Sequence, residues 1–194
     1  MGLGQCACVR IRNLEHARIN IAKTFHLSSL TPHTCPLIVR KRNPHKTSDP
    51  RRDTEEAVAG VRQIYAELKA NPPERNCTLQ TECCRFQITG QTPVLTKGEA
   101  LTAAKAVRSA GRKELPKRDD GACPLLHPYT SRCMIYEGRP FGCRTHFCEA
   151  AGGPYSRREV SDWIRRLEEI DERLGGDGGR DITVAIRDAL EDLK

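Results

Sequence analysis

Seven cysteines fall between residues 77 and 148 of this 194-residue chain, and their thiols are the side chains best suited to chemistry. They form an earlier run and a later run: Cys77, Cys83 and Cys84, then Cys123, Cys133, Cys143 and Cys148. Prolines and glycines punctuate the later run, which disfavours a long helix or a buried strand. Thiolates are soft ligands that select zinc and iron–sulfur clusters over hard cations. The pattern predicts two loops wrapped around a metal.

Disulfides are the competing use of these thiols. Adjacent Cys83 and Cys84 cannot easily bridge each other, because a disulfide needs Cα atoms about 4.4 to 6.8 Å apart and bonded neighbours lie about 3.8 Å apart. The sequence shows no convincing secretory signal and no apolar run long enough to span a membrane. We therefore expect a cytoplasmic, reducing environment, in which clustered cysteines are more often metal ligands than disulfides.

The spacing leaves the kind of metal open. A Cys-x2-Cys pair, common in structural zinc sites, is absent from the sequence, which weakens a zinc-finger or zinc-ribbon interpretation. An iron–sulfur cluster accepts ligands from scattered loops, and seven thiols exceed the four that one zinc ion or cluster needs. A binuclear site and one cluster with spare thiols both fit. Because adjacent thiols usually diverge, we expect only one of Cys83 and Cys84 to coordinate, the other serving a second metal, a disulfide or packing.

Histidines and arginines accompany the later cysteines. His146, two residues before Cys148, is a candidate ligand, and His127 a weaker one; either could instead support a ligand or lie exposed. Arg139 and Arg144 flank Cys143, where their charges would lower thiol pKa values and balance a thiolate-bound metal. The simpler alternative is a surface ion pair between Arg139 and Glu137.

The net charge of +7 is unevenly distributed. Residues 1–52 carry +8 and the remainder carries −1, so nucleic-acid binding is not expected of the body of the chain, residues 53–194. Residues 1–52 lack a helical or strand period, and we interpret them as a basic, poorly ordered extension. A targeting segment, a nucleic-acid arm and a segment outside the mature protein remain alternatives.

Apolar spacing predicts four helices in the body. The first begins at Asp53 and ends at Asn71, and the second follows a Thr96–Glu99 capping box. The third follows a Ser156–Glu159 capping box. Its solvated face is expected to carry Asp171, Glu172 and two pairs of adjacent arginines, Arg157/Arg158 and Arg165/Arg166. The fourth covers about residues 182–193, and residues 85–89 could form a short strand. We expect a mainly α, small irregular α(+β) domain with about four helices around a cysteine-rich centre and at most a minor hairpin.

Two strings carry a family resemblance: Cys77-x5-Cys83-Cys84, and Arg132-Cys-Met-Ile-Tyr-Glu-Gly-Arg-Pro-Phe-Gly-Cys-Arg144. Together with Cys123-Pro-Leu-Leu they resemble the YkgJ family of cysteine cluster proteins, whose CxxCxxCC-type domain is described as zinc- or iron-chelating. The resemblance covers roughly residues 55 to 150. Gln80 stands where relatives often carry a further cysteine, so a site shared with them would use Cys148 or His146 instead, or leave a position open.

We therefore expect a metal-binding protein in which thiolates from two loops chelate zinc, iron or a 4Fe–4S cluster and organise the fold. The resemblance also implies an alternative, a redox, electron-transfer or methylase-type enzyme component, because flagellin lysine methylases carry a similar domain. No glycine-rich nucleotide loop follows a strand pattern, and no hydrolytic side-chain set is suggested, so an enzymatic role stays undecided. A disulfide-stapled or thiol-redox protein is the third possibility.

Overall fold

The computed structural model describes residues 49–71, 75 and 81–194. Cys77 and the predicted extension, except for residues 49–52, lie outside the described residues, so the predicted boundary at residue 52 remains a prediction. The described part is mainly helical, as the sequence predicts. Its elements are α1 (Pro50–Ala70), η1 (Glu82–Cys84), α2 (Phe86–Thr89), β1 (Val94–Leu95), α3 (Lys97–Ser109), η2 (Tyr136–Gly138), α4 (Phe141–Thr145), η3 (Glu149–Ala151), α5 (Arg157–Arg173), β2 (Arg180–Asp181) and α6 (Ile182–Asp192).

Local capping chemistry sets where the long helices begin. The predicted capping boxes of α3 and α5 are both present, with Glu99 and Glu159 reaching back to Thr96 and Ser156. The predicted start of α1 at Asp53 is wrong. Pro50 takes the first helical position, which needs no N–H donor, and the Asp49 side chain caps the helix by accepting from Arg51 N at 3.0 Å.

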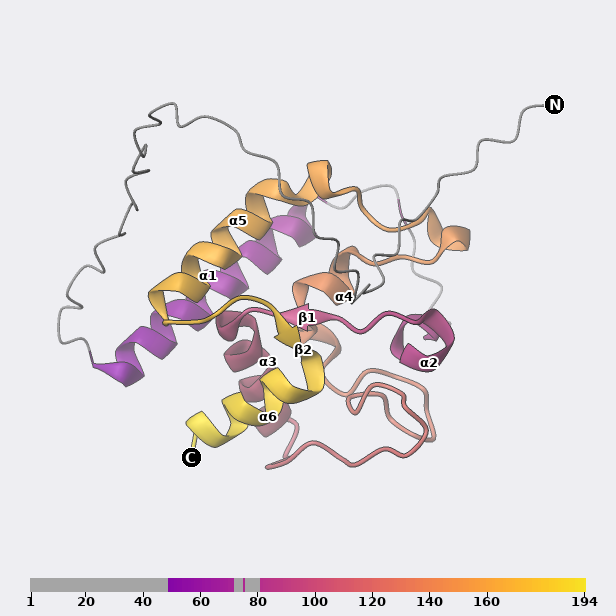
Figure 1. Cartoon of the computed structure of the whole chain (residues 1–194), viewed down its shortest axis with the longest axis horizontal. Coiled ribbons are helices and arrows are strands. Elements are labelled where there is room, and N and C mark those ends of the chain that lie inside the picture. Colours follow the sequence, from indigo (N-terminus) through magenta and orange to yellow (C-terminus); the bar gives the residue numbers. More distant parts are fainter. Residues whose placement is uncertain (1–48, 72–74, 76–80) are drawn as a thin grey trace, which may run out of the picture. The chain divides into compact units, whose positions relative to one another are not determined.

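The four long helices pack in two connected groups (Figure 1). Helix α3 contacts α1, α5 and α6, while α1 and α5 lie side by side. One apolar cluster joins α1 to α5 and includes Val61, Ile64, Leu167 and Ile170. The other joins α3 to α6 and includes Leu101, Val107, Ile182 and Ile186. The approach is close at Gly98, where an added Cβ would lie 2.8 Å from Ile170 Cγ2.

A sheet of two strands, each two residues long, connects distant parts of the chain and is not a hairpin. Strands β1 and β2 pair antiparallel, Val94 with Asp181 and Leu95 with Arg180. Ile182 N donates to Pro93 O at 3.0 Å, which holds the start of α6 beside β1. The predicted strand at residues 85–89 is instead α2. Gly90, at φ +65°, accommodates the left-handed end of α2 and its N–H donates to Phe86 O.

Two residues predicted to lie on the solvated face of α5 do not. Asp171 is only 3% exposed, and its carboxylate accepts from the backbone N–H groups of Lys97 at 2.6 Å and Gly178 at 3.0 Å. Arg166 is half-buried and reaches across to Glu67 on α1, with Nη2 3.0 Å from Oε1. Arg165 does remain exposed, paired with Glu169 along the same helix. The face of α5 is therefore divided between solvent and contacts to α1 and α3.

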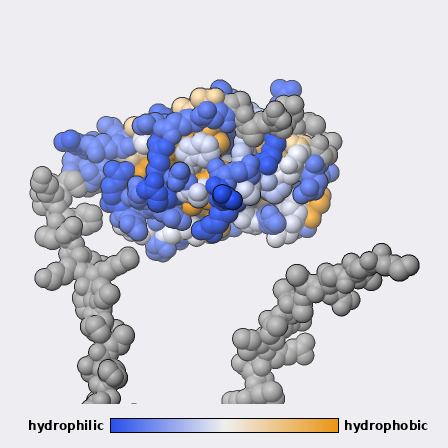
Figure 2. Space-filling view, turned by 90° about the horizontal axis from the view of Figure 1, so that it is seen from above, coloured by the Kyte–Doolittle hydropathy of each residue, from blue (hydrophilic) through white to orange (hydrophobic). Residues whose placement is uncertain are grey.

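The surface of the described residues is largely polar. The face in Figure 2 is mostly hydrophilic, with scattered apolar areas. Large exposed apolar side chains are few in this part of the chain: Ile88, Val94, Tyr129, Tyr136 and Val184. Within the described ranges, no helix combines the length and apolarity that crossing a membrane requires.

Candidate metal centre

The two cysteine-bearing segments meet through their backbones. Cys123 N–H donates to Cys84 O at 2.7 Å, so a residue of the later run lies directly against one of the earlier run. The turn η1 presents Cys83 and Cys84, and it follows Thr81, whose φ of 59° redirects the chain. Since the contact joins residues 39 positions apart, it depends on the tertiary fold and not on local spacing.

A folded-back loop brings Cys133 toward Cys123. Leu126 and Cys133 form an isolated antiparallel bridge, and Met134 N donates to Leu125 O at 2.8 Å. Arg118 braces the loop by donating from Nη1 to Leu126 O at 2.7 Å. The nine residues between these two cysteines therefore form a loop whose two ends lie side by side.

The short helix α4 carries Cys143, and a buried carboxylate holds its first residue. Phe141 N donates to Glu99 Oε1 at 2.8 Å, and Glu99 is 4% exposed. On the other side, Arg144 donates from Nε to Arg139 O at 2.8 Å and stacks its guanidinium 4.2 Å from the Tyr65 ring centroid. These contacts fix the segment from Arg139 to Arg144 against α1 and α3.

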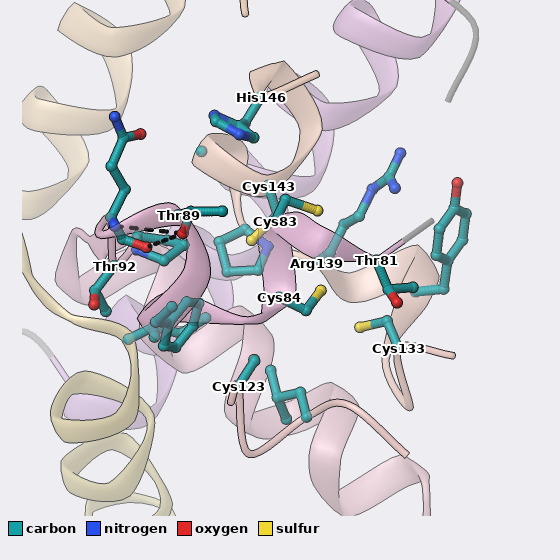
Figure 3. A pocket seen from close by; sticks show the side chains of 18 of the residues that line it. Thr81, Cys83, Cys84, Thr89, Thr92, Cys123, Cys133, Arg139, Cys143 and His146 are labelled. Atoms are coloured by element: carbon teal, nitrogen blue, oxygen red, sulfur yellow. Dashed lines mark hydrogen bonds between the residues drawn. The ribbon is translucent and has the colours of Figure 1, made fainter. Parts of the chain in front are cut away.

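Five thiols line one cavity of about 930 Å³, which we name the thiol cavity (Figure 3). They come from η1, the folded-back loop and α4: Cys83, Cys84, Cys123, Cys133 and Cys143. His146 and Arg139 also line it, and no Asp or Glu does so among the described residues. Thiols from both segments therefore line the same cavity.

Two other candidate residues lie differently. Cys148 is not among the described residues that line the thiol cavity. His127 Nδ1 accepts from the backbone N–H groups of Tyr129 and Thr130, at 3.4 and 3.3 Å. Its ring therefore organises a turn of the folded-back loop, one of the supporting roles left open from the sequence.

Cys83 and Cys84 do not diverge as expected. Both side chains line the thiol cavity, where the interaction between the two thiols lowers the pKa of Cys83 to about 6 and raises that of Cys84. Burial and the nearby thiols of Cys123 and Cys143 raise the pKa of Cys84 further. The left-handed residue before η1 and its tight turn place both side chains at the same cavity wall, which residue spacing alone does not reveal.

The deeper thiols strongly favour their neutral form. Burial raises the pKa of Cys123 to about 11, with a further contribution from Cys133. Burial also raises the pKa values of Cys133 and Cys143, and charge on neighbouring thiols adds to both effects. Such groups repel one another once ionised, and a bound cation removes that penalty by stabilising the thiolates.

The cavity thiols suit a soft metal, although their side chains are not arranged around a common centre. All six described cysteines are free. No group of three or more His, Cys, Asp or Glu side chains in residues 49–71, 75 and 81–194 is arranged to hold an ion. Thiols without hard carboxylates fit zinc or iron–sulfur chemistry. Coordination would require these side chains to move toward a common point.

Arg139 supplies positive charge beside the thiols. Its guanidinium lies 4.1 Å from the Tyr136 ring centroid, and it lowers the pKa values of Cys83, Cys133 and Cys143. Its Nε atom is buried and has no hydrogen-bond partner among the described residues. Glu137 Oε2 lies 3.7 Å from Lys69 Nζ, so Glu137 pairs with Lys69 rather than with Arg139, the alternative raised from the sequence.

Comparison with known proteins finds a family of metal-chelating domains. A family model described as CxxCxxCC, a putative zinc- or iron-chelating domain, matches residues 75–164. No curated protein and no solved structure matches the chain. The matched range contains all five thiols of the thiol cavity.

Proposed function

We propose that residues 75–164, which match the family model of CxxCxxCC zinc- or iron-chelating domains, bind metal in the thiol cavity through thiolates from both cysteine runs. The observation that carries the proposal is the meeting of the two runs, through the Cys123–Cys84 hydrogen bond and the shared cavity. The sequence offers seven candidate ligands, Cys77, Cys83, Cys84, Cys123, Cys133, Cys143 and Cys148, and we assign Cys148 no ligand role because it lies outside the described cavity lining. Within this pool, the five cavity thiols form the core of the site.

Charge supports this assignment. Several buried thiolates close together would be unfavourable without a cation, as the raised pKa values of Cys123 and Cys143 indicate. A divalent zinc ion or an iron centre would compensate them, and Arg139 would offset the remaining negative charge. The absence of carboxylates among the described cavity residues disfavours hard cations such as calcium or magnesium.

Bound metal would also stabilise the fold. Cys123 belongs to the apolar cluster of α3 and α6, and Cys84, Cys133 and Cys143 pack against it. Joining these side chains through one ion would tie η1, the folded-back loop and α4 to that cluster. Because the site is assembled only in the folded chain, part of the free energy of metal binding becomes free energy of folding.

An iron–sulfur redox component is the second candidate. The observation that favours it is the scattered origin of the cavity thiols, which come from η1, the folded-back loop and α4 without a Cys-x2-Cys pair. Such a cluster would supply one-electron chemistry. A visible absorbance band that dithionite bleaches would favour this role, and a colourless protein containing zinc would favour a structural one.

Elemental analysis of the full chain purified without oxygen tests metal binding. We expect zinc or iron at one or more equivalents per chain, and a reduced content of that metal in Cys123→Ser and Cys143→Ser. Cys148→Ser is the matched control, because Cys148 lies outside the described cavity lining, and it should retain the metal. Equal metal content in the wild type and in both cavity variants would contradict the proposed ligand core.

A further inference from the structure

The N-terminus of α4 depends on a side chain from another helix. Pro140 occupies the N-cap position, and its side chain makes no capping hydrogen bond. The first N–H of α4, that of Phe141, donates instead to Glu99 Oε1 at 2.8 Å. A carboxylate on α3 therefore orients a helix that carries Cys143 two residues later.

The Glu99 carboxylate is held on both oxygens. Its Oε2 accepts from Thr96 N at 3.1 Å and Thr96 Oγ1 at 3.0 Å, which completes the capping box of α3. Its Oε1 accepts from Phe141 N and from Tyr65 Oη, the latter at 3.2 Å. One oxygen thus caps α3, and the other joins α1 to α4. A capping box alone does not require the second set of contacts.

We infer that Glu99 is a positioning residue of the metal centre, one that fixes the approach of Cys143 by holding the start of α4. This inference rests on the proposed function. The supporting contacts are rigid because Glu99 is buried at 4% exposure and its Tyr65 partner at 5%. Partners that orient metal ligands commonly change metal affinity by about 10- to 100-fold when they are removed.

Glu99→Ala and Thr96→Ala form a matched pair for the test. Thr96→Ala removes the Oγ1 contact of the capping box and leaves Oε1 free to accept from Phe141. Glu99→Ala removes both sets of contacts. With Co²⁺ and Zn²⁺ as probes added to the metal-free full chain, we expect Glu99→Ala to weaken affinity by about 10-fold or more. Thr96→Ala should stay within about three-fold of the wild type, even if its thermal midpoint falls.

A double-mutant cycle with Cys143→Ser separates positioning from general destabilisation. If Glu99 acts through Cys143, Glu99→Ala should have little further effect on affinity in the Cys143→Ser background. It should keep its full effect in the Cys123→Ser background. The same additional loss in both backgrounds would overturn the inference. No effect of Cys143→Ser on affinity would instead overturn the proposed ligand role of Cys143, so the two failures are distinguishable.

Glu99→Gln keeps the test informative if the alanine variant does not fold. The amide oxygen can still accept from Phe141 N, whereas its NH₂ group cannot accept from Thr96 N. We expect near wild-type metal affinity together with a lowered thermal midpoint. Hydrogen exchange in the wild-type protein provides a separate check: rapid exchange of the Phe141 amide would overturn the inference, and slow exchange would support it.

Discussion

Replacement of Asp171 by alanine should destabilise the protein strongly, although its sequence context suggests a solvated position. The side chain is 3% exposed, and it accepts from Lys97 N at 2.6 Å and Gly178 N at 3.0 Å. Lys97 is the first residue of α3, so this contact anchors the helix that presents Glu99. Loss of Asp171 would therefore weaken the support of the thiol cavity as well as the fold.

The expected magnitude follows from the two hydrogen bonds. A hydrogen bond to a charged group contributes about 1.5–3 kcal/mol, so two would contribute about 3–6 kcal/mol. Lys97 and Gly178 are exposed residues, and water can partly replace the lost acceptor, which lowers the expected cost to about 2–4 kcal/mol. For a chain of this size, that corresponds to a decrease in Tm of about 5–15 °C.

Thermal and urea unfolding followed by circular dichroism would measure the change. Glu172→Ala, an exposed neighbour on α5, is the matched control and should change stability by less than about 0.5 kcal/mol. Asp171→Asn should be intermediate, because the amide retains one of the two oxygens. If Asp171→Ala is no less stable than Glu172→Ala, the two backbone hydrogen bonds do not contribute as the structure implies.

Three further predictions concern the thiol cavity. In metal-free protein that remains helical by circular dichroism, iodoacetamide labelling of Cys83 should rise with pH around a midpoint near 6, because Cys84 stabilises its thiolate. Cys84→Ala should move that midpoint upward, and an unchanged midpoint would refute the effect of Cys84 on Cys83. Arg139→Gln should raise the pKa values of Cys83, Cys133 and Cys143, so zinc binding, measured as a function of pH, should require a higher pH. Arg157→Gln, at an exposed residue outside the described cavity lining, should have little effect. Zinc at 100 times its Kd should stabilise the chain by about 2.7 kcal/mol, measured as a Tm increase that a chelator reverses; no increase would count against coupling of metal binding to folding.

Features encoded by neighbouring residues could be predicted from the sequence. The capping boxes at Thr96 and Ser156 are examples, because a side chain three residues away satisfies each helix start. The last helix is another, since the spacing of Ile182, Ala185 and Ile186 places them on one buried face. The start of α1 was misplaced because Asp49 and Asp53 both suit an N-cap, and Pro50 decides between them.

Features that depend on tertiary contacts could not be predicted in the same way. Asp171 and Glu99 are acidic residues of the kind that usually lie at the surface. Both are nevertheless buried, and both accept hydrogen bonds from backbone N–H groups of distant segments. The sequence identified Glu99 only as a cap, with no signal for its second contact to Phe141. The cysteine spacing predicted two converging loops, but the placement of both Cys83 and Cys84 at one cavity depends on the geometry of η1.

Residue-resolved alkylation during a metal titration tests most directly whether both cysteine runs share one metal centre. Mass spectrometry would follow each cysteine of the full chain as zinc or iron is added without oxygen. Thiols of both runs, such as Cys83 and Cys133, should become protected together at the same metal concentration, while Cys148 remains reactive. Protection confined to one run, or no protection of either, would contradict a shared metal centre.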